Sequence, residues 1–461
     1  MERSIDRRTF LRRAALLAAA APSLRGLAAC SDPSGPRRGA GYGPLSPSPD
    51  VPELMIPAGF SAARLSVTGR PSTANPSLVV PNALDGMAAF ALPGGRVRLV
   101  RNHELRDPAA SSVPLGSPAR SYDARAGGGT TTLEVRVTGG RPELVAEFVS
   151  LSGTAVNCAG GPTPWGTWIS CEETVEGVSH GRLRPHGYCF EVPAAGGAEA
   201  DPVPLTAMGR FVHEAVAVDP ATGIVHLTED QRYDPAAGLP GAGFYRFLPS
   251  LPGDPRGGGR LQMLAIDGAP GYLTATGQTV GAELPARWVE IADPDPAAAE
   301  TDPHAVFRQG LAGGGAVFQR LEGCWPGDGS IYFNATAGGD AGAGQVWQYR
   351  PRGGGGVLRL VFESPGPEVL DAPDNLCVSP RGGLVLCEDG TGPQYLRGLT
   401  PGGEIFDLVR TTAESSTEFA GSCFSPDGSI LFFNLQGSGT RTGTVSGATY
   451  ALWGPWRDGA L

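Results

Sequence analysis

The sequence predicts an all-β protein, a six-bladed β-propeller with an insertion in the middle of the chain. Its 461 residues include 69 glycines and 43 prolines, together about a quarter of the chain. Glycine costs about 1 kcal/mol and proline about 3 kcal/mol in a helix interior, so this composition disfavours long helices and suits short strands joined by tight turns. Hydrophobic residues make up 41% of the chain, which is enough for a packed core.

Six hairpin signals recur along the chain, each a glycine-containing turn between two runs of strand-forming residues. Spread over about 430 residues, they give about 72 residues per unit, the size of a four-stranded propeller blade. Residues 250–315 lack the signal and are interpreted as an insertion, a lid or a rim element. A two-sheet sandwich with several hairpins is the alternative. The six signals cover residues 88–104, 157–173, 213–230, 322–335, 374–389 and 418–436.

Residues 1–30 are predicted to be an export signal. Arg7 and Arg8 precede an alanine- and leucine-rich stretch, which is the pattern of a twin-arginine signal. Residues 27–30 resemble a bacterial lipobox in which Cys30 is acylated, and a simple cleavage near Ala29 is the alternative. We therefore expect an exported protein, either lipid-anchored in the cell envelope or extracellular.

After the signal, residues 31–55 are predicted to be a flexible tether, because serine, proline and glycine dominate them. Residues 56–461 are predicted to form the propeller domain. Nothing after residue 30 resembles an apolar span of about 20 residues, so the sequence predicts no transmembrane helix there.

Charge and composition exclude several classes of function. Residues 1–29 contribute six arginines and two acidic residues to a whole-chain formal charge of −10, which leaves about −14 for the remainder. An acidic chain without a basic patch is a poor nucleic-acid binder, so we expect no nucleic-acid partner and membrane contact through the lipid anchor alone. All 36 basic residues are arginine, which excludes a P-loop lysine and a Schiff-base lysine.

Polar side chains recur at equivalent places in the hairpins. Cys158, Glu214 and Glu322 each stand five residues before a turn, and Asp374 with Asn375 takes a comparable place. Because a hairpin returns to the edge where it began, we expect these residues to meet the polar residues that follow the second strands at one mouth of the central channel. The residues after the second strands are Glu104, Glu172, Glu173, Glu229, Asp230, Asn334, Glu388, Asp389 and Gln436.

So many carboxylates in one partly dry place would repel one another unless they were protonated or bridged by cations. Oxygen-rich clusters favour calcium, and an added thiolate favours a transition metal. Arg320, two residues before Glu322, is the candidate anion clamp, because a guanidinium can bind phosphate through two hydrogen bonds. The alternatives are that the acids are solvated residues flanking turns and that Arg320 forms a structural ion pair.

Seven cysteines follow Cys30, an odd number, so at least one is unpaired or a ligand. Cys377 and Cys387 lie symmetrically about a turn and could face each other. Cys158 and Cys171 do the same, and disulfides are permitted outside the cytoplasm. A Cys158–Cys171 bridge would remove the thiolate, and the sequence leaves both possibilities open.

Several of these segments resemble the PhoX family of bacterial alkaline phosphatases. The resemblance rests on N-C-A-G-G-P-T-P-W-G-T-W-I-S-C-E-E (157–173), G-R-F-V-H-E-A-V-A-V-D-P (209–220), F-Q-R-L-E-G (318–323), P-D-N-L-C-V-S-P-R-G-G-L-V-L-C-E-D (373–389), F-A-G-S-C-F-S-P-D-G-S-I-L-F-F-N-L-Q (419–436) and R-N-H-E (101–104). It implies a six-bladed propeller that hydrolyses phosphomonoesters with two ferric irons and several calcium ions joined by an oxo bridge.

By this resemblance, Cys158, Glu214 and Glu322 correspond to the iron ligands and Arg320 to the phosphate-binding arginine, so that Arg320 and Glu322 are the expected catalytic residues. The resemblance also implies a small phosphomonoester substrate, and we expect a monomer. The expected calcium ligands are Glu104, Glu172, Glu173, Glu229, Asp230, Glu388 and Asp389.

Two other classes of function remain open. A calcium-dependent lactonase or arylesterase would share the propeller, although its metal sites use carboxylate and amide oxygens and the cysteine at position 158 argues against it. A non-catalytic, lipid-anchored propeller scaffold would need no metal site, and the repeated acids argue against it.

Overall fold

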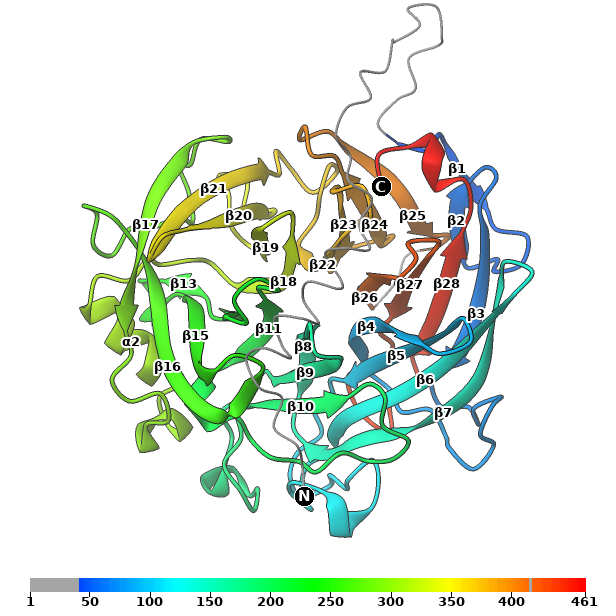
Figure 1. Cartoon of the computed structure of the whole chain (residues 1–461), viewed down its shortest axis with the longest axis horizontal. Coiled ribbons are helices and arrows are strands. Elements are labelled where there is room, and N and C mark those ends of the chain that lie inside the picture. The colour runs from blue at the N-terminus through cyan, green and yellow to red at the C-terminus, as the bar shows by residue number, and fades with distance from the viewer. Residues whose placement is uncertain (1–40, 414–416) are drawn as a thin grey trace, which may run out of the picture.

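The computed structural model describes residues 41–413 and 417–461, in which strands arranged around a common centre are the predominant regular structure (Figure 1). All the strand pairs are antiparallel, as expected for hairpins joined by tight turns. The prediction of an all-β, propeller-like fold is therefore confirmed. Among the described residues, no helix is long and apolar enough to span a bilayer.

The first two ladders follow each other directly along the chain. The first is a four-stranded sheet and the second has three strands. Their strands are β4 (Leu84–Leu92), β5 (Arg96–His103), β6 (Gly128–Thr138) and β7 (Arg141–Thr154), then β8 (Asn157–Pro162), β9 (Thr167–Glu172) and β10 (Cys189–Pro193).

The third and fourth ladders are joined into one nine-stranded sheet. The joining strand is β17 (Glu283–Glu290), which pairs with β16 on one side and with β21 on the other. The remaining strands are β11 (His213–Val218), β12 (Val225–Glu229), β15 (Phe244–Leu251), β16 (Asp254–Ile266), β18 (Leu321–Gly327), β19 (Ser330–Ala335), β20 (Gln345–Arg352) and β21 (Gly355–Glu363). Hydrogen bonding thus does not divide the described chain into six separate blades.

The fifth and sixth ladders both include strands from the beginning of the described chain. β3 (Ser61–Val67) pairs with β28 (Ala448–Trp453) and so closes the ring between the two ends of the domain. β2 (Leu54–Pro57) pairs with β25 and β1 (Leu45–Pro47) with β2. The other strands are β22 (Pro373–Val378), β23 (Leu384–Glu388), β24 (Tyr395–Leu399), β25 (Ile405–Thr411), β26 (Phe419–Phe424) and β27 (Ile430–Leu435).

The predicted tether over residues 31–55 overlaps β1 and β2, so from Leu45 onward the chain belongs to the sheet instead. The physical reason is apolar burial within a proline-rich stretch, because Val51, Leu54 and Ile56 are all at most 3% exposed. The predicted twin-arginine signal and the acylated Cys30 lie outside the described residues.

The first strands of the six hairpins stand side by side around the axis. β4 neighbours β8, and the order continues through β11, β18, β22 and β26, which returns to β4. Trp325 on β18 packs against four of the separate core clusters, as a side chain at a shared centre would. The inner strands are therefore held in fixed relative positions by packing around the axis.

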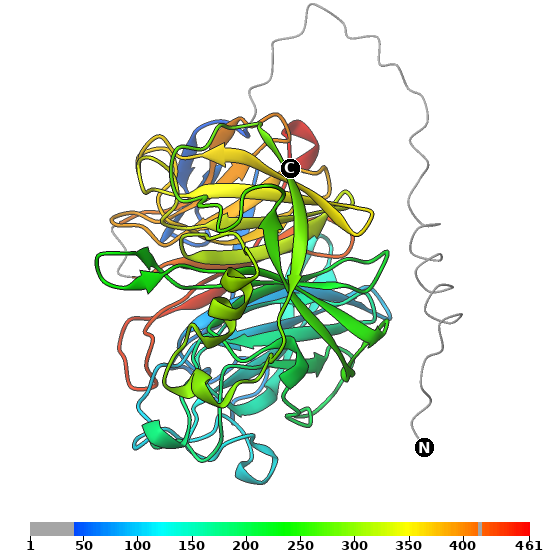
Figure 2. The ribbon, with the colours of Figure 1, turned by 90° about the vertical axis from the view of Figure 1, so that its left-hand side faces the viewer.

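The residues predicted as an insertion are partly strand and partly rim. In this segment, β16 and β17 are part of the nine-stranded sheet. The helix α2 (Ala305–Ala312) packs Val306 and Phe307 into the hydrophobic core beside β16. Figure 2 shows α2 on the outside of the strands. The minor elements are η1 (Pro118–Arg120), η2 (Val178–His180), η3 (Thr206–Met208), η4 (Ala297–Glu300), η5 (Trp456–Asp458), β13 (Tyr233–Asp234) and β14 (Leu239–Pro240).

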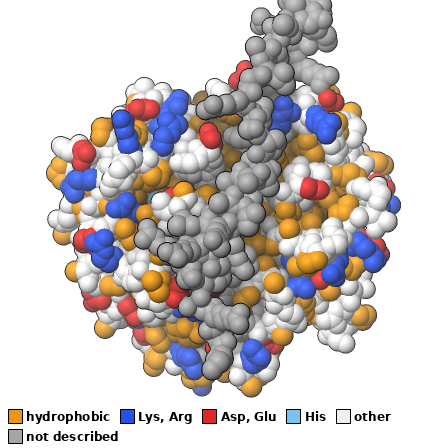
Figure 3. Space-filling model, in the orientation of Figure 1, with side chains coloured by type: hydrophobic (Ala, Val, Ile, Leu, Met, Phe, Trp, Pro, Cys, Tyr) orange, Lys and Arg blue, Asp and Glu red, His pale blue; other side chains and the backbone are white. Residues whose placement is uncertain are grey.

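The face of the molecule seen in Figure 3 shows arginines distributed around the rim, interspersed with acidic and apolar side chains.

Candidate functional site

Each of the six inner strands carries a β-bulge near the start of its hairpin. In β4, for example, Leu84 pairs with His103 and Met87 with Arg101, so two residues oppose one. A bulge of this kind redirects a side chain out of the regular alternation of a strand. The first bulged residues are Asp85, Cys158, Glu214, Glu322, Asp374 and Gly421. Five of the six hairpins thus present an acid or a thiol at the bulge.

Polar side chains from the second strands hold the bulges across neighbouring hairpins. Each donates a hydrogen bond to the carbonyl oxygen of a bulged residue in the next hairpin around the ring. These donor–acceptor pairs, which we call latches, are Asn102–Cys158 (3.0 Å), Thr228–Glu322 (2.6 Å), Asn334–Asp374 (2.7 Å) and Asn434–Asp85 (2.7 Å). The latches fix the backbone from which the acidic side chains project.

The residue that follows each second strand forms a second tier. Its backbone N–H donates to the carbonyl oxygen of the residue two positions before the bulge. The acidic members of this tier are Glu104 (bonded to Ala83, 2.8 Å), Glu173 (Val156, 2.8 Å), Asp230 (Val212, 3.2 Å) and Asp389 (Ala372, 2.9 Å).

The residue two positions before the bulge has a left-handed backbone in four hairpins. The φ angles of Ala83, Val156, Arg320 and Ala372 lie between 48° and 54°. Such angles are unfavourable for these side chains and are maintained here by the surrounding hydrogen bonds. In the fourth hairpin this position is Arg320, which explains why an arginine lies beside the acids.

These tiers enclose one polar cavity of about 240 Å³. Its lining residues are Glu104, Arg106, Cys158, Glu173, Glu214, Arg320, Glu322, Asp374, Asp389, Thr417, Glu418 and Gln436. Seven of the residues singled out from the sequence as metal ligands or phosphate clamp are brought together here. Asp230 adjoins the cavity, because its carboxylate binds Arg320 (2.8 Å from Oδ2 to Nη2).

The side chains of the cavity lie close enough to share cations. Three groups have ligand atoms within 4.8 Å of one another, and the groups are linked because Cys158 and Glu214 each belong to two of them. The three groups are Asp85–Glu104–Cys158, Cys158–Glu173–Glu214 and Glu214–Glu322–Asp374.

Burial and mutual repulsion raise the pKa values of these acids. For Glu104 and Asp374 the pKa rises to about 7, chiefly by burial and further by neighbouring carboxylates. The pKa values of Glu173, Glu214 and Glu322 lie well above their ordinary value for the same reasons. A cavity built from acids that resist ionisation together is one in which bound cations would be strongly favoured.

The donor set fits cations. The buried Glu214 Oε2 has no hydrogen-bond partner among the described residues, whereas its Oε1 accepts a hydrogen bond from the Cys158 thiol at 3.0 Å. A single sulfur among carboxylate oxygens offers a transition-metal ligand set next to an oxygen-rich one suited to calcium.

Two arginines flank the acids. Arg320 binds Asp230 and also Glu322, with 2.8 Å between Nη2 and Oε1 of the glutamate. Arg106 bridges Glu104 and Glu173, and its side chain is 50% exposed. Charge from both arginines therefore reaches the rim of the cavity.

Three predicted calcium ligands, Glu172, Glu229 and Glu388, lie outside the cavity. Each immediately precedes an acid of the second tier, and the alternation of side chains along a strand turns it to the opposite side of the strand. Glu229 accepts hydrogen bonds from Gly243 N (2.9 Å) and Tyr245 Oη (2.7 Å). Glu388 forms an ion pair with Arg397 (2.7 Å). Both carboxylates are thus engaged in holding neighbouring strands.

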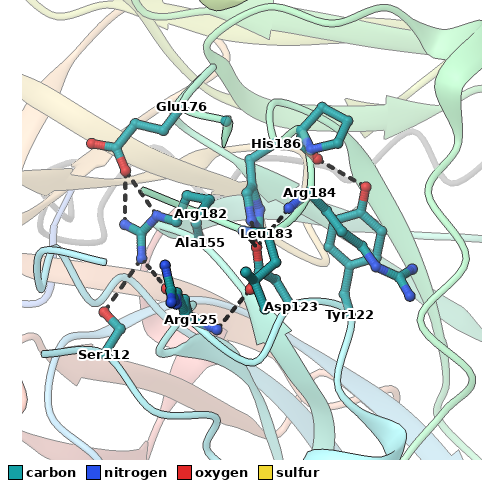
Figure 4. A network of polar contacts seen from close by, with 12 residues as sticks. Ser112, Tyr122, Asp123, Arg125, Ala155, Glu176, Arg182, Leu183, Arg184 and His186 are labelled. Carbon is teal, nitrogen blue, oxygen red and sulfur yellow. Dashed lines mark hydrogen bonds and ion pairs between the residues drawn. The ribbon is translucent and has the colours of Figure 1, made fainter. Parts of the chain in front are cut away.

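Glu172 is the third. Its carboxylate accepts hydrogen bonds from backbone N–H groups and lies 2.6 Å from His186 Nδ1, whose other ring nitrogen lies 3.4 Å from Asp123. Asp123 also accepts hydrogen bonds from the backbone of Leu183 and Arg184 (Figure 4). The network ties the loop after β5 to the loop after β9, which is a structural role.

Every cysteine in the described part of the chain is a free thiol. The Cys158–Cys171 and Cys377–Cys387 bridges considered from the sequence are therefore not formed. Cys158 faces the cavity, whereas Cys171 contacts Cys189 on the neighbouring strand.

Sequence reasoning missed four contributors. Asp85 precedes the first hairpin signal (88–104), although Asp85-Gly86 repeats the pattern of Glu322-Gly323. Asp374 has an equivalent position in its hairpin, but the sequence prediction gives it no ligand role. Arg106 and Glu418 stand outside the two polar positions that recur in the hairpins. The remaining lining residues, Thr417 and Gln436, are polar; Gln436 Nε2 donates to Glu104 (2.8 Å) and Asp85 (3.1 Å).

This chain is similar to several known proteins. A solved structure of Pseudomonas fluorescens PhoX in complex with vanadate, a transition state analogue, matches with a TM-score of 0.66 and 18% identity, covering 90% of this chain and 98% of that chain. A gluconolactonase from Xanthomonas campestris matches with a TM-score of 0.42 and 14% identity, covering 91% of this chain and 99% of that chain. Among curated proteins, none matches the sequence significantly. The profile of the family described as alkaline phosphatase PhoX matches residues 40–439, and the chain therefore belongs to that family.

Proposed function

We propose that this protein is a metal-dependent phosphomonoesterase whose reaction takes place in the acidic cavity. The observation that carries the proposal is the set of three linked carboxylate and thiol groups, with ligand atoms within 4.8 Å, flanked by two arginines. Membership of the alkaline phosphatase PhoX family supports a phosphomonoester as the substrate class. The solved PhoX structure with vanadate supports a phosphoryl-like transition state for the same fold.

The cations are assigned from the donor atoms. Cys158, Glu214 and Glu322 would hold the two ferric irons, because they combine the sulfur with buried carboxylates. The remaining acids around the cavity would hold calcium, which prefers carboxylate oxygens. Bound cations would supply Lewis-acid stabilisation of the charge that develops on the phosphoryl oxygens. The proposed calcium ligands are Asp85, Glu104, Glu173, Asp374, Asp389 and Glu418.

Arg320 would orient the substrate. The Asp230 carboxylate binds the Nε and Nη2 edge of its guanidinium at 3.0 and 2.8 Å, which fixes the plane of the group. We assign the Nη1 end to an equatorial phosphoryl oxygen, where a preorganised cation is most effective in a site with little water. Arg106, which bridges two acids in this structure, would add a second positive charge to the cavity.

The test combines elemental analysis with hydrolysis of p-nitrophenyl phosphate. We expect iron and calcium in the purified protein, and Glu322→Ala to lose both bound iron and at least 100-fold of kcat. Arg320→Ala should keep its metals and lose transition-state binding, by about 10- to 1,000-fold in kcat/KM. The matched control is Glu143→Ala, since Glu143 is exposed and pairs only with Arg136 in the described structure.

The other outcomes select the other functions. Calcium alone with turnover of a lactone would replace the proposal by a lactonase, and a metal-free, stable protein without turnover of either substrate would replace it by a scaffold.

Export and lipid attachment are proposed from the sequence. Arg7, Arg8 and Cys30 are the supporting residues. Labelling with a fatty acid analogue should mark the wild type and not Cys30→Ala, and labelling of both would contradict the proposal.

A single species of about 47.5 kDa or less in size-exclusion chromatography with light scattering is expected for a monomer.

A further inference from the structure

Two buried cysteines face each other across neighbouring strands behind the cavity. Cys171 on β9 is the register partner of Cys189 on β10, and their sulfur atoms lie 3.6 Å apart. Both side chains are fully buried. They lie 18 positions apart in the sequence, so the pairing is made by the fold and not by a local turn.

The type of strand pair favours a bond between them. The backbone N–H of Glu172 donates to the Tyr188 carbonyl oxygen at 3.1 Å, which makes Glu172 and Tyr188 a hydrogen-bonded pair. The next pair along an antiparallel ladder is of the non-hydrogen-bonded kind, whose Cα atoms lie about 4.5 Å apart. This separation falls within the range of about 4.4–6.8 Å that disulfides span, so Cys171 and Cys189 could be joined without moving the strands apart.

We propose that Cys171 and Cys189 form an oxidisable pair that closes to a cross-strand disulfide in the presence of a small-molecule disulfide. The Cys189 sulfur attacks one sulfur of the reagent, the reagent's S–S bond breaks, and one thiolate leaves. The Cys171 sulfur then attacks Cys189, the mixed disulfide breaks, and the second thiolate leaves. The two protein thiols are oxidised, the reagent is reduced to two thiols, and the two protons of the cysteines pass to the leaving groups.

The surroundings assign the first step to Cys189. Its sulfur lies 3.6 Å from Nδ1 of His213, whose Nε2 donates to the Gly209 carbonyl oxygen at 2.9 Å. Burial opposes ionisation of Cys189, but the contacts with Cys171 and His213 outweigh it and lower the pKa of the thiol to about 6. The thiolate is the attacking species in disulfide exchange.

The position of the pair gives the bond a structural consequence. β10 has five residues and ends a ladder of only three strands. The bond would fasten it to Cys171 of β9, two residues before Glu173, which lines the cavity. His213, which contacts Cys189, directly precedes Glu214, which also lines the cavity. The disulfide would therefore stiffen the backbone beneath two cavity acids. This proposal does not depend on the proposed phosphatase activity.

The first test maps the bond in the full chain by mass spectrometry. One sample of folded protein is incubated with oxidised glutathione, and another is refolded in its presence. Refolding exposes the sulfur atoms to the reagent even if they are inaccessible in the folded protein. The chain has eight cysteines. We expect two fewer free thiols than in the reduced protein and one linked peptide pair containing Cys171 and Cys189. Cys189→Ala should keep every thiol free.

The matched control is Cys324→Ala, which removes a buried thiol whose pKa is raised by burial alone. It should still lose two thiols to the same linked peptides. Retention of all seven thiols that follow Cys30 in the wild type after both treatments, or linkage among others of these seven, would overturn the proposal.

The second test compares the unfolding equilibrium of the oxidised and reduced proteins. It shows whether the disulfide stabilises the fold or forms without affecting it. A loop of this length predicts an unfolding equilibrium constant about 100-fold lower in the oxidised wild type than in the reduced protein. Cys189→Ala should unfold identically under both conditions. A linked wild type that unfolds no less readily than the reduced protein would contradict the stiffening.

Discussion

Glu214 is the residue on which the cation site most depends. It belongs to two of the three candidate cation groups, and one of its buried oxygens has no hydrogen-bond partner in the described structure. Burial, followed by the charges of Glu173 and Asp374, raises its pKa well above the ordinary value. The side chain thus opposes folding when it ionises without a cation and supplies a ligand when one is bound.

For Glu214→Gln we expect two effects of opposite sign. Cation affinity should fall at least 100-fold, because a carboxylate ligand is lost. The cation-free variant should have a melting temperature at pH 8 equal to or above that of the cation-free wild type, because a buried acid has been neutralised. Calorimetry with and without a chelator measures both. A lower melting temperature of the cation-free variant would contradict the interpretation.

Gly421 is the bulge residue of the hairpin that presents no acid. Its φ is 60°, and a Cβ built there would lie 2.4 Å from the Asp85 carbonyl oxygen and 2.7 Å from Asn434 Nδ2. Glycine is therefore required by the close approach of the first and last ladders rather than by chemistry.

Gly421→Ala is expected to cost at least about 2 kcal/mol, because the strained angle and the clash add to each other. Urea unfolding of the cation-free protein gives the value. Gly329→Ala, at a turn with a φ of 67° and no atom within 4 Å of a Cβ built there, is the control that carries the backbone strain alone, and it should cost less. Equal costs would show that the close approach to Asp85 is unimportant.

At the scale of elements, the latches couple each hairpin to the next. Between the fourth and fifth hairpins, the side-chain amide of Asn334 on β19 donates a hydrogen bond to the carbonyl oxygen of Asp374 on β22. Asn334 is fully buried, and Asp374 is buried as well. Loss of the donor would leave a buried carbonyl without a partner and loosen the strand that carries Asp374.

Asn334→Ala should therefore lower the free energy of unfolding by about 1–3 kcal/mol and also weaken cation binding. The control is Gln309→Ala on α2, whose amide donates to the Asp293 carbonyl oxygen at 2.8 Å far from the inner strands. It should lower stability without changing cation affinity. The measurements are urea unfolding and calcium titration, and unchanged affinity in Asn334→Ala would contradict the coupling.

At the scale of the whole molecule, ring closure brings all the acids to one place. β26 lies beside β4, and β3 from the start of the described domain completes the last ladder with β28. This convergence has an electrostatic cost, since the largely buried cavity acids lie close together with only two arginines among them. Stability of the molecule should consequently depend on pH and on cations together.

The sign follows from the pKa values. Burial raises the pKa of Glu104 and of Asp374 to about 7, above their ordinary values of 4.5 and 3.8. Acids with raised pKa values contribute stability at low pH and lose it as pH rises through the folded value. The cation-free protein should therefore melt at least about 5 °C lower at pH 8 than at pH 5.

Calcium should reverse this loss, with a larger gain in melting temperature at pH 8 than at pH 5, where protons compete for the same oxygens. Scanning calorimetry with a chelator and with calcium at both pH values provides the four measurements. A calcium effect of equal size at the two pH values would contradict a site made of these acids.

The sequence by itself determined the all-β class, the six hairpins and the chemical kinds of residue that the site uses, because turn residues, strand formers and acids recur in register. It identified Cys158, Glu214, Glu322 and Arg320 as neighbours. It also indicated where each hairpin returns to its starting edge, which is why Glu104, Glu173 and Asp389 were anticipated.

Only the tertiary structure decided which member of each adjacent acidic pair faces the cavity. Glu173 and Asp389 line it, whereas Glu172 and Glu388 bind neighbouring strands. The deciding feature is where each second strand ends: the backbone N–H groups of Glu173 and Asp389 donate to Val156 and Ala372, and alternation along the strand turns the preceding acid away from the cavity. Closure of the ring likewise added Glu418 to the cavity, because contacts between the two ends of a chain follow from packing and not from local pattern.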